Sequence, residues 1–179
     1  NASGAFNWSG GTISGSGLLN TQSGSTTNLA SVTLGANRTW NNVGNATWAT
    51  TGNSQGFALN GVMNNLSGGL FNINVSGSYD GGNISGSGTI NNAGEFRKSL
   101  NGVVKATSVA PTFNNLATGV VNVNSGTLIL NGAGTDVSGG AYNLANGTTL
   151  EFGAAARTLA SSITGLGTGI VKFTGGGVR

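Results

Sequence analysis

Apolar and polar residues alternate along many short segments of this chain. In residues 71–75 and 121–124, a large apolar residue occupies every second position and asparagines lie between them. A period of two places successive side chains on opposite faces of a β-strand. The alternating segments are three to five residues long and are separated by Gly, Asn and Ser, which tolerate the backbone angles of tight corners. The pattern therefore predicts an all-β fold, in which only residues 154–163 are compatible with a helical turn or two.

One local pattern recurs at a spacing of about 50 residues, which is within the range that repeat folds show. Three eight-residue segments begin at Leu66, Leu116 and Leu166, and each has a glycine three residues later and alternating apolar residues after it. A repeat at a fixed spacing is typical of folds that stack similar units. The repeat predicts that these three leucines lie directly over one another.

A second marker, the pair Asn-Asn, recurs at about half that spacing. Each pair follows a large apolar residue, and the first and third intervals between pairs are equal and slightly shorter than the second. The pairs are Asn41-Asn42, Asn64-Asn65, Asn91-Asn92 and Asn114-Asn115, preceded by Trp40, Met63, Ile90 and Phe113. A unit of about 21–28 residues with two or three short strands is typical of one turn of a parallel β-solenoid. About seven such turns fit residues 1–179, which we predict to be a single domain.

In a solenoid, equivalent side chains of successive turns stack into ladders. We expect apolar side chains to form an inward ladder and asparagines to hydrogen-bond along the stack, as identical side chains do in cross-β structures. The predicted ladder residues are Leu66, Phe71, Ile73, Leu116, Val121, Val123, Leu166, Val171 and Phe173, with Asn65, Asn92 and Asn115. An antiparallel sandwich also has short strands at regular intervals, but it does not account for a pattern that returns at the longer spacing.

Composition favours an ordered chain over a disordered one. The chain has 34 glycines and one proline, and only 6% of its residues are charged, but 37% are hydrophobic. Disordered chains are usually highly charged and poor in β-branched and aromatic residues. Cysteine and histidine are absent, which excludes disulfides and the commonest zinc ligand.

The distribution of charge argues against two classes of partner. The net charge of +3 comes from scattered residues, and only Arg97 and Lys98 are adjacent cations, so no basic stripe for nucleic acid is present. No apolar run approaches the roughly 18 residues that membrane insertion requires. The chain begins at Asn1 without a signal sequence, and we expect a processed product or a fragment of a longer repeat protein.

The chain offers few groups for catalysis. Its acidic residues are Asp80, Glu95, Asp136 and Glu151, and no spacing among them forces two carboxylates together, whereas glycoside hydrolysis needs a pair about 5–10 Å apart. The only fragment that resembles a polysaccharide-lyase site is Arg97-Lys98 beside Glu95. Residues 131–139 partly resemble a calcium-binding nonapeptide, but in a single copy. We therefore predict no enzyme activity, no metal and no cofactor.

Three tryptophans lie in the N-terminal part of the chain. Exposed tryptophan commonly stacks on sugars or anchors an interface, which makes Trp8 and Trp48 candidates for surface or glycan contact, with a core position as the alternative. Trp40 directly precedes an Asn-Asn pair, in the position held elsewhere by Met63, Ile90 and Phe113. We predict that Trp40 lies in the core.

Several of these segments together resemble bacterial surface adhesins. They are the run Gly-x-Ile-Ser-Gly-Ser-Gly at residues 11–17 and 82–88, the Asn-Asn pairs, and residues 121–128. Most of the chain is similar in texture to filamentous-haemagglutinin-like proteins and to autotransporter passengers. The resemblance implies a right-handed parallel β-helix that is secreted outside Gram-negative cells and serves in adhesion, biofilm or rigid stalks. No functional residue carries over from it.

The leading hypothesis is an extracellular structural or adhesive module at the bacterial cell surface, a stiff rod that makes many weak polar contacts. The expected partners are glycans or proteins of a host or neighbouring cell, or further copies stacked end to end into a filament. The alternatives are a carbohydrate-binding or carbohydrate-cleaving β-helix, of the tailspike or polysaccharide-lyase type, and an ice-binding face. Thr12, Thr33, Thr39 and Thr47 recur too irregularly to favour ice binding.

Overall fold

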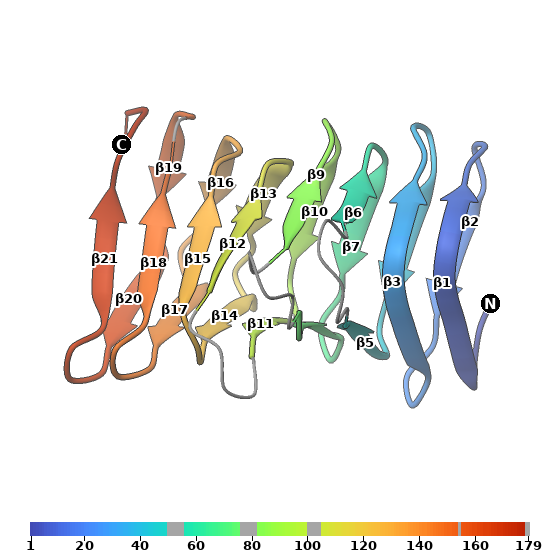
Figure 1. Cartoon of the computed structure of the whole chain (residues 1–179), viewed down its shortest axis with the longest axis horizontal. Coiled ribbons are helices and arrows are strands. Elements are labelled where there is room, and N and C mark those ends of the chain that lie inside the picture. The colour runs from blue at the N-terminus through green and yellow to red at the C-terminus, as the bar shows by residue number, and fades with distance from the viewer. Residues whose placement is uncertain (50–55, 76–81, 100–104, 154, 178–179) are drawn as a thin grey trace.

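The computed structural model describes residues 1–49, 56–75, 82–99, 105–153 and 155–177. These residues form 21 β-strands and no helix, and the strands coil into a parallel β-solenoid of about seven turns. The windings lie side by side along the long axis, with the N-terminal and C-terminal windings at opposite ends (Figure 1). The predicted parallel solenoid is confirmed. Within the described ranges, no helix is long and apolar enough to cross a membrane.

Each winding has three sides, here named faces 1, 2 and 3. Face 1 is a seven-stranded parallel sheet whose strands are β2 (Leu18–Thr21), β4 (Thr39–Asn42), β7 (Val62–Asn65), β10 (Thr89–Asn92), β13 (Thr112–Asn115), β16 (Gly134–Asp136) and β19 (Arg157–Leu159). Each of these strands pairs with the face 1 strand of the next winding, so the sheet runs the length of the solenoid.

Faces 2 and 3 belong to one 14-stranded sheet, because the nine-residue strands β1 (Ala5–Ile13) and β3 (Thr26–Leu34) run along both. Face 2 continues with β5 (Asn45–Trp48), β8 (Leu70–Ile73), β11 (Glu95–Lys98), β14 (Val120–Val123), β17 (Ala141–Leu144) and β20 (Ser162–Gly165). Face 3 continues with β6 (Gly56–Leu59), β9 (Asn83–Ser85), β12 (Ala106–Val109), β15 (Thr127–Leu130), β18 (Thr149–Phe152) and β21 (Ile170–Phe173).

The register between windings follows the predicted repeat closely. On face 2, Phe71, Phe96 and Val121 are paired at two equal steps along the chain, and Tyr142 and Ile163 continue the row at two equal but shorter steps. The shortest step of all pairs β3 with β5, and the longest is shared by the pairs β7 with β10 and β6 with β9. The shortest step falls slightly below the predicted range, because β3 runs from face 2 to face 3 without a break and only two residues connect β4 to β5.

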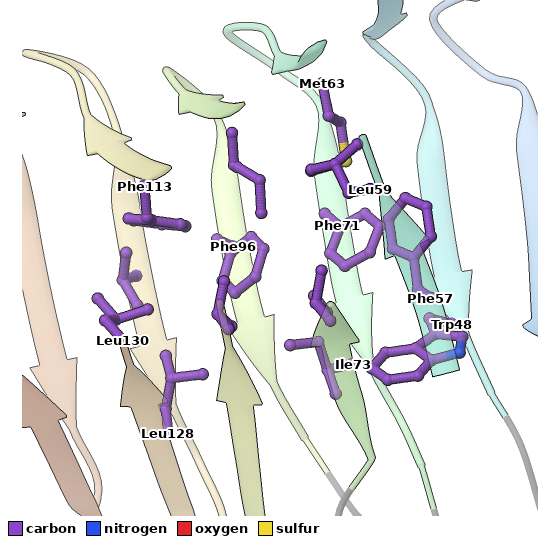
Figure 2. Close-up of a cluster of buried hydrophobic side chains, with 14 of the residues drawn as sticks. Trp48, Phe57, Leu59, Met63, Phe71, Ile73, Phe96, Phe113, Leu128 and Leu130 are labelled. Atoms are coloured by element: carbon purple, nitrogen blue, oxygen red, sulfur yellow. The ribbon is translucent and has the colours of Figure 1, made fainter. Parts of the chain in front are cut away.

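Alternate residues of most strands point inward and form one continuous core. The fully buried rings of Trp40, Phe57, Phe71, Phe96 and Phe113 pack in sequence along the axis, with neighbouring centroids 5.0–6.5 Å apart. Figure 2 shows four of these rings among aliphatic side chains from neighbouring windings. Aromatic side chains bury about 150–250 Å² each and so supply much of the apolar burial. The predicted core position of Trp40 is confirmed.

Apart from the three leucines, the residues predicted to form inward ladders are buried in the middle windings and partly exposed in the last winding. Phe71, Ile73, Val121 and Val123 lie inside, as do Asn65, Asn92 and Asn115. In the last winding, Val171 is half-buried and Phe173 is 53% exposed, although the Phe173 ring stacks on Phe152 with centroids 5.2 Å apart.

Leu66, Leu116 and Leu166 do not form an inward ladder, and that part of the prediction is wrong. All three lie at corners, where Leu66 and Leu166 are 39% and 62% exposed. Leu66 and Leu116 follow β7 and β13 on face 1 and share one corner, two windings apart. Leu166 follows β20 on face 2, and its N–H donates to the backbone oxygen of Leu144. The third copy therefore repeats the local form of a corner but not its place in the winding.

The long spacing between the first two copies arises because the corner between faces 1 and 2 alternates in length. Two residues connect β4 to β5 and β10 to β11, whereas four residues connect β7 to β8 and β13 to β14. In this part of the chain, the repeating unit is therefore a pair of windings with one short and one long corner.

The helical turns considered for residues 154–163 are absent from the described part of that segment. It contains β19 and the start of β20, which pair in parallel with β16 and β17. Hydrogen bonding to the preceding winding overrides the local alanine-rich preference, as tertiary context commonly does.

Candidate functional site

Trp8 and Trp48, the candidates for surface contact, are both buried. Trp8 is 5% exposed and its ring packs edge-on against Phe57, with centroids 6.4 Å apart. Trp48 is fully buried, and its indole N–H donates to the backbone oxygen of Ala30 at 2.9 Å. A buried ring offers no platform to a sugar, and the polar edge of Trp48 is in addition already satisfied. The prediction of surface or glycan contact is therefore wrong for both tryptophans.

The second asparagine of each Asn-Asn pair points into the solenoid from face 1. Asn42, Asn65, Asn92 and Asn115 are completely buried, and each of the first three donates from Nδ2 to Oδ1 of the next at 2.8–2.9 Å. Each of the four also donates to a backbone carbonyl on face 2 of the following winding, at 2.9–3.4 Å. Because buried amides need partners, this inner ladder fixes the register of four windings.

The first asparagine of each pair forms an outer row on the same strands. Asn41, Asn64, Asn91 and Asn114 each donate from Nδ2 to Oδ1 of the preceding winding at 2.8–2.9 Å, beginning at Asn20. The outer row thus donates toward the N-terminus and the inner ladder toward the C-terminus. The amide dipoles of the two rows oppose each other, so face 1 carries little net field along the axis from its side chains.

A buried ionic cluster, which the sequence analysis missed, continues the inner ladder after Asn115. Asp136 pairs with Asn115, and its carboxylate accepts two bonds from Arg157 and one from the hydroxyl of Tyr142, all at 2.8 Å. Burial raises the pKa of the Tyr142 hydroxyl, which therefore stays protonated and donates. Burial alone would lower the pKa of Arg157, but its contacts with Asp136 and Tyr142 together outweigh this effect and the net shift is upward. The cluster is an enclosed ion pair in which Asp136 accepts on both carboxylate oxygens and only Nη1 of Arg157 lacks a partner, as expected of a structural group.

Side chains of this cluster and of the outer row also bridge an interruption of face 1 between β13 and β16. Between these two strands, Asn115 and Asp136 form the only residue pair. The N–H of Thr135 donates to Oδ1 of Asn114 at 2.9 Å, and the N–H of Asn115 donates to Oδ1 of Asp136 at 3.1 Å. Arg157 donates to the backbone oxygen of Phe113. The backbone groups of the interrupted sheet are therefore satisfied without a regular ladder.

The acidic residues that the structure describes do not converge. Glu95 lies on face 2, Glu151 lies on face 3 and Asp136 is buried behind face 1, while Asp80 falls outside the described residues. Within the described ranges, no group of three or more acidic side chains is placed to hold a metal ion.

The four threonines considered for ice binding do not share a face. Thr12 and Thr33 are paired on face 3, Thr39 lies on face 1, and Thr47 lies on face 2. A continuous threonine array is therefore not formed by these residues.

A cavity of about 520 Å³ lies where face 2 meets the corner from face 1, and we name it the face 2 notch. The short corner of Ala93 and Gly94 lies between the longer corners 66–69 and 116–119 of the two neighbouring windings. The longer corners supply the walls, and the hydroxyl of Thr118 donates to the backbone oxygen of Ala93 at 2.7 Å. Outward side chains of face 2, including Leu70, Glu95 and Val120, complete the lining.

The notch contains an ion pair on its floor. Arg97 donates from Nε and Nη2 to the two carboxylate oxygens of Glu95, both at 2.7 Å, and Asn122 adds a third bond at 2.6 Å. The bonds from Arg97 hold the pKa of Glu95 below its usual value, although partial burial opposes them. The same contact raises the pKa of Arg97. Both groups are therefore ionised at neutral pH, and the notch carries no net charge from this pair.

Lys98 does not share the outer surface of face 2 with Glu95 and Arg97, the other charged residues of the lyase-like fragment. It points inward from β11 and is 1% exposed, because successive residues of a strand face opposite sides. Burial lowers the pKa of Lys98 to about 8. The fragment Glu95 to Lys98 therefore divides between the notch and the core.

Comparisons of the chain with models of known protein families, with curated proteins and with solved structures give no match. Function must therefore be inferred from the fold and from the surface that the windings present.

Proposed function

We propose that this chain is a segment of an extracellular adhesin or stalk of the bacterial cell surface, in which the stacked windings act as a stiff rod. The observation that supports this best is the continuity of the stack. Buried amide bonds link Asn42 through Asn115, and the aromatic stack extends over the same windings. In a solenoid each unit contacts only its neighbours, so a bonded contact at each step from Asn42 to Asn115 stiffens this part of the rod.

The surface supports a role in contact rather than in catalysis. Only 6% of the chain is charged, and outward positions of face 1 carry asparagine and threonine in rows. Such groups form weak hydrogen bonds, and many of them on one rod act together through a high effective concentration. The composition and repeats that resemble filamentous-haemagglutinin-like proteins and autotransporter passengers support the same role. The proposed partners are glycans or proteins of a host or neighbouring cell, or further copies of the rod.

Bead adhesion under flow tests the proposal. Beads that carry the protein at graded surface densities are passed over cultured cells and over glycan-coated surfaces, with albumin-coated beads as the control. Retention should rise more steeply than in proportion to density, because each contact is weak and several must form together. A folded protein that gives no retention above albumin at any density would contradict the adhesive role. Release of reducing ends from a polysaccharide would instead favour the enzymatic alternative.

A further inference from the structure

The face 2 notch is an open recess that combines aliphatic floor groups and fixed polar groups, and we infer that it binds a neutral saccharide unit of a cell-surface glycan. The inference rests on the proposed adhesive function and gives it a ligand class. The notch volume of about 520 Å³ falls within the range of roughly 300–1,000 Å³ that is typical of small-molecule sites.

The shape of the notch is fixed by the backbone. Its depth comes from the two missing corner residues of the β10 winding, relative to the windings on either side. Each wall is a turn closed by its own backbone bond, from the Gly69 N–H to the Leu66 oxygen and from the Gly119 N–H to the Leu116 oxygen, both at 2.8 Å. Each wall is also tied to the preceding winding, because the N–H groups of Leu66 and Leu116 donate to the backbone oxygens of Asn42 and Asn92 at 2.9 and 2.8 Å. The notch is therefore formed before any ligand arrives, which reduces the entropic cost of binding.

The floor of the notch offers both kinds of contact that a sugar ring requires. Leu70, Glu95 and Val120 are paired in consecutive windings, so two half-buried aliphatic side chains flank one carboxylate. A pyranose ring has an apolar C–H surface, which can pack on Leu70 or Val120, and hydroxyls at its edge. A carboxylate has about four acceptor positions, and Arg97 and Asn122 together use three on Glu95. The remaining position can accept a bond from a sugar hydroxyl.

Two other polar groups at the notch also keep hydrogen-bonding positions that a ligand can use. The hydroxyl of Thr118 donates its proton to the oxygen of Ala93, so its own oxygen remains free to accept a bond from the ligand. Arg97 uses Nε and Nη2 on Glu95, and its remaining N–H groups can donate. The notch thus presents acceptors and donors within one cavity.

Charge favours a neutral ligand over an acidic or basic one. Glu95 and Arg97 neutralise each other through two bonds of 2.7 Å. An anionic sugar would have to compete with Glu95 for Arg97, and a cationic sugar would have to compete with Arg97 for Glu95. A neutral sugar can bind without breaking the pair, and its affinity should depend little on salt.

The test is a glycan array that carries neutral hexose and N-acetylhexosamine oligosaccharides together with sialylated and uronate-containing ones. The wild-type protein is compared with Ala93→Leu, which fills the notch, and with Ala145→Leu, a matched change at the corner between β17 and β18. Wild type and Ala145→Leu should bind neutral oligosaccharides alike, whereas Ala93→Leu should bind them about tenfold more weakly, a loss of one or two contacts. Equal binding by all three proteins, or wild-type binding to acidic glycans alone, would overturn the inference.

A second variant keeps the test decisive if Ala93→Leu fails to fold. Glu95→Gln keeps the size of the side chain but leaves Arg97 unpaired, so neutral binding should weaken and acidic glycans should gain signal. Glu151→Gln on face 3 is the matched control and should change neither. If Glu95→Gln left both signals unchanged, the notch would not be the site.

Bead adhesion separates this inference from the proposed function. If Ala93→Leu beads adhere as well as wild-type beads, the rod is adhesive and the notch inference is wrong. If wild-type beads do not adhere and the array gives no signal, the adhesive role itself fails.

Discussion

Replacing Asn92 by alanine should destabilise the solenoid far more than replacing its neighbour Asn91. The two residues are adjacent on β10, and the substitutions remove the same atoms. Asn92 is fully buried in the inner ladder, whereas Asn91 is half-buried in the outer row. The comparison therefore isolates the burial of the amide from the strand preference of the residue.

The expected loss for Asn92→Ala follows from its bonds. The change removes contacts with Asn65, Asn115 and the backbone oxygen of Val120. Asn65 keeps its bond to the oxygen of Glu95, but Oδ1 of Asn115 loses its amide donor in a site closed to water. A stranded buried group costs about 1–3 kcal/mol and a lost net hydrogen bond costs about 1 kcal/mol. The free energy of unfolding should therefore fall by about 3 kcal/mol.

Asn91→Ala should cost less than about 1 kcal/mol, because water can replace its lost partners. Urea denaturation followed by far-UV circular dichroism measures both losses. The comparison requires that the free energy of unfolding falls with urea concentration at the same slope in the wild type and in both variants. Equal losses for Asn91→Ala and Asn92→Ala would refute the reasoning, since the inner ladder would then contribute no more than the outer row.

Three further predictions concern the core and the interruption of face 1. Arg157→Met should lower the free energy of unfolding by about 3–5 kcal/mol, because Asp136 is left charged and buried; adding Asp136→Asn should recover much of the loss in thermal denaturation, and no recovery would contradict the pairing. Gly134→Ala should cost about 1–3 kcal/mol, because its Cβ would overlap the backbone oxygen of Phe113, whereas Gly4→Ala, with no atom within 4 Å, should leave the melting temperature nearly unchanged. Burial lowers the pKa of Lys98 from 10.5 to about 8, so the unfolded chain binds more protons between these values and stability should rise from about pH 8 to pH 10. Urea denaturation of Lys98→Met should show a smaller rise, and an unchanged rise would exclude Lys98 as its source.

The solenoid could be predicted because its markers recur once per winding. Each Asn-Asn pair marks one face 1 strand, and the residue before it marks the core. The longer repeat spacing reflects a true structural period for Leu66 and Leu116, but Leu166 shares only the local corner pattern. Corners of one type occur at more than one place in a winding, so a local motif alone does not define register.

The burial of Trp8 and Trp48 was harder to predict from sequence. In β1, Trp8 lies two residues after the smaller apolar residue Phe6, and in β5, Trp48 lies two residues after Ala46. That pattern places the two side chains on one side of the strand, but it does not say which side faces the core. The inward side follows only from the pairing of each strand with its neighbouring windings.

Two features depended on contacts between windings that the sequence pattern did not reveal. Asp136 takes the ladder position after Asn115, but glycine stands at position 134 where earlier windings have a large apolar residue, which hid the match. Arg157 fills that space from the next winding. The notch requires a short corner to lie between two long ones, and only the stacking places them together.

Cysteine cross-linking tests the stacking of windings most directly, because the chain has no cysteine of its own. Asn64 and Asn91 are paired in neighbouring windings, and paired strands lie about 4.8 Å apart, within the span of about 4.4–6.8 Å between Cα atoms that a disulfide needs. The double variant Asn64→Cys with Asn91→Cys should form an intramolecular disulfide on mild oxidation, detected by mass spectrometry. Asn64→Cys with Asn114→Cys, two windings apart, should not. Cross-linking of the second pair but not of the first would contradict the coiled arrangement.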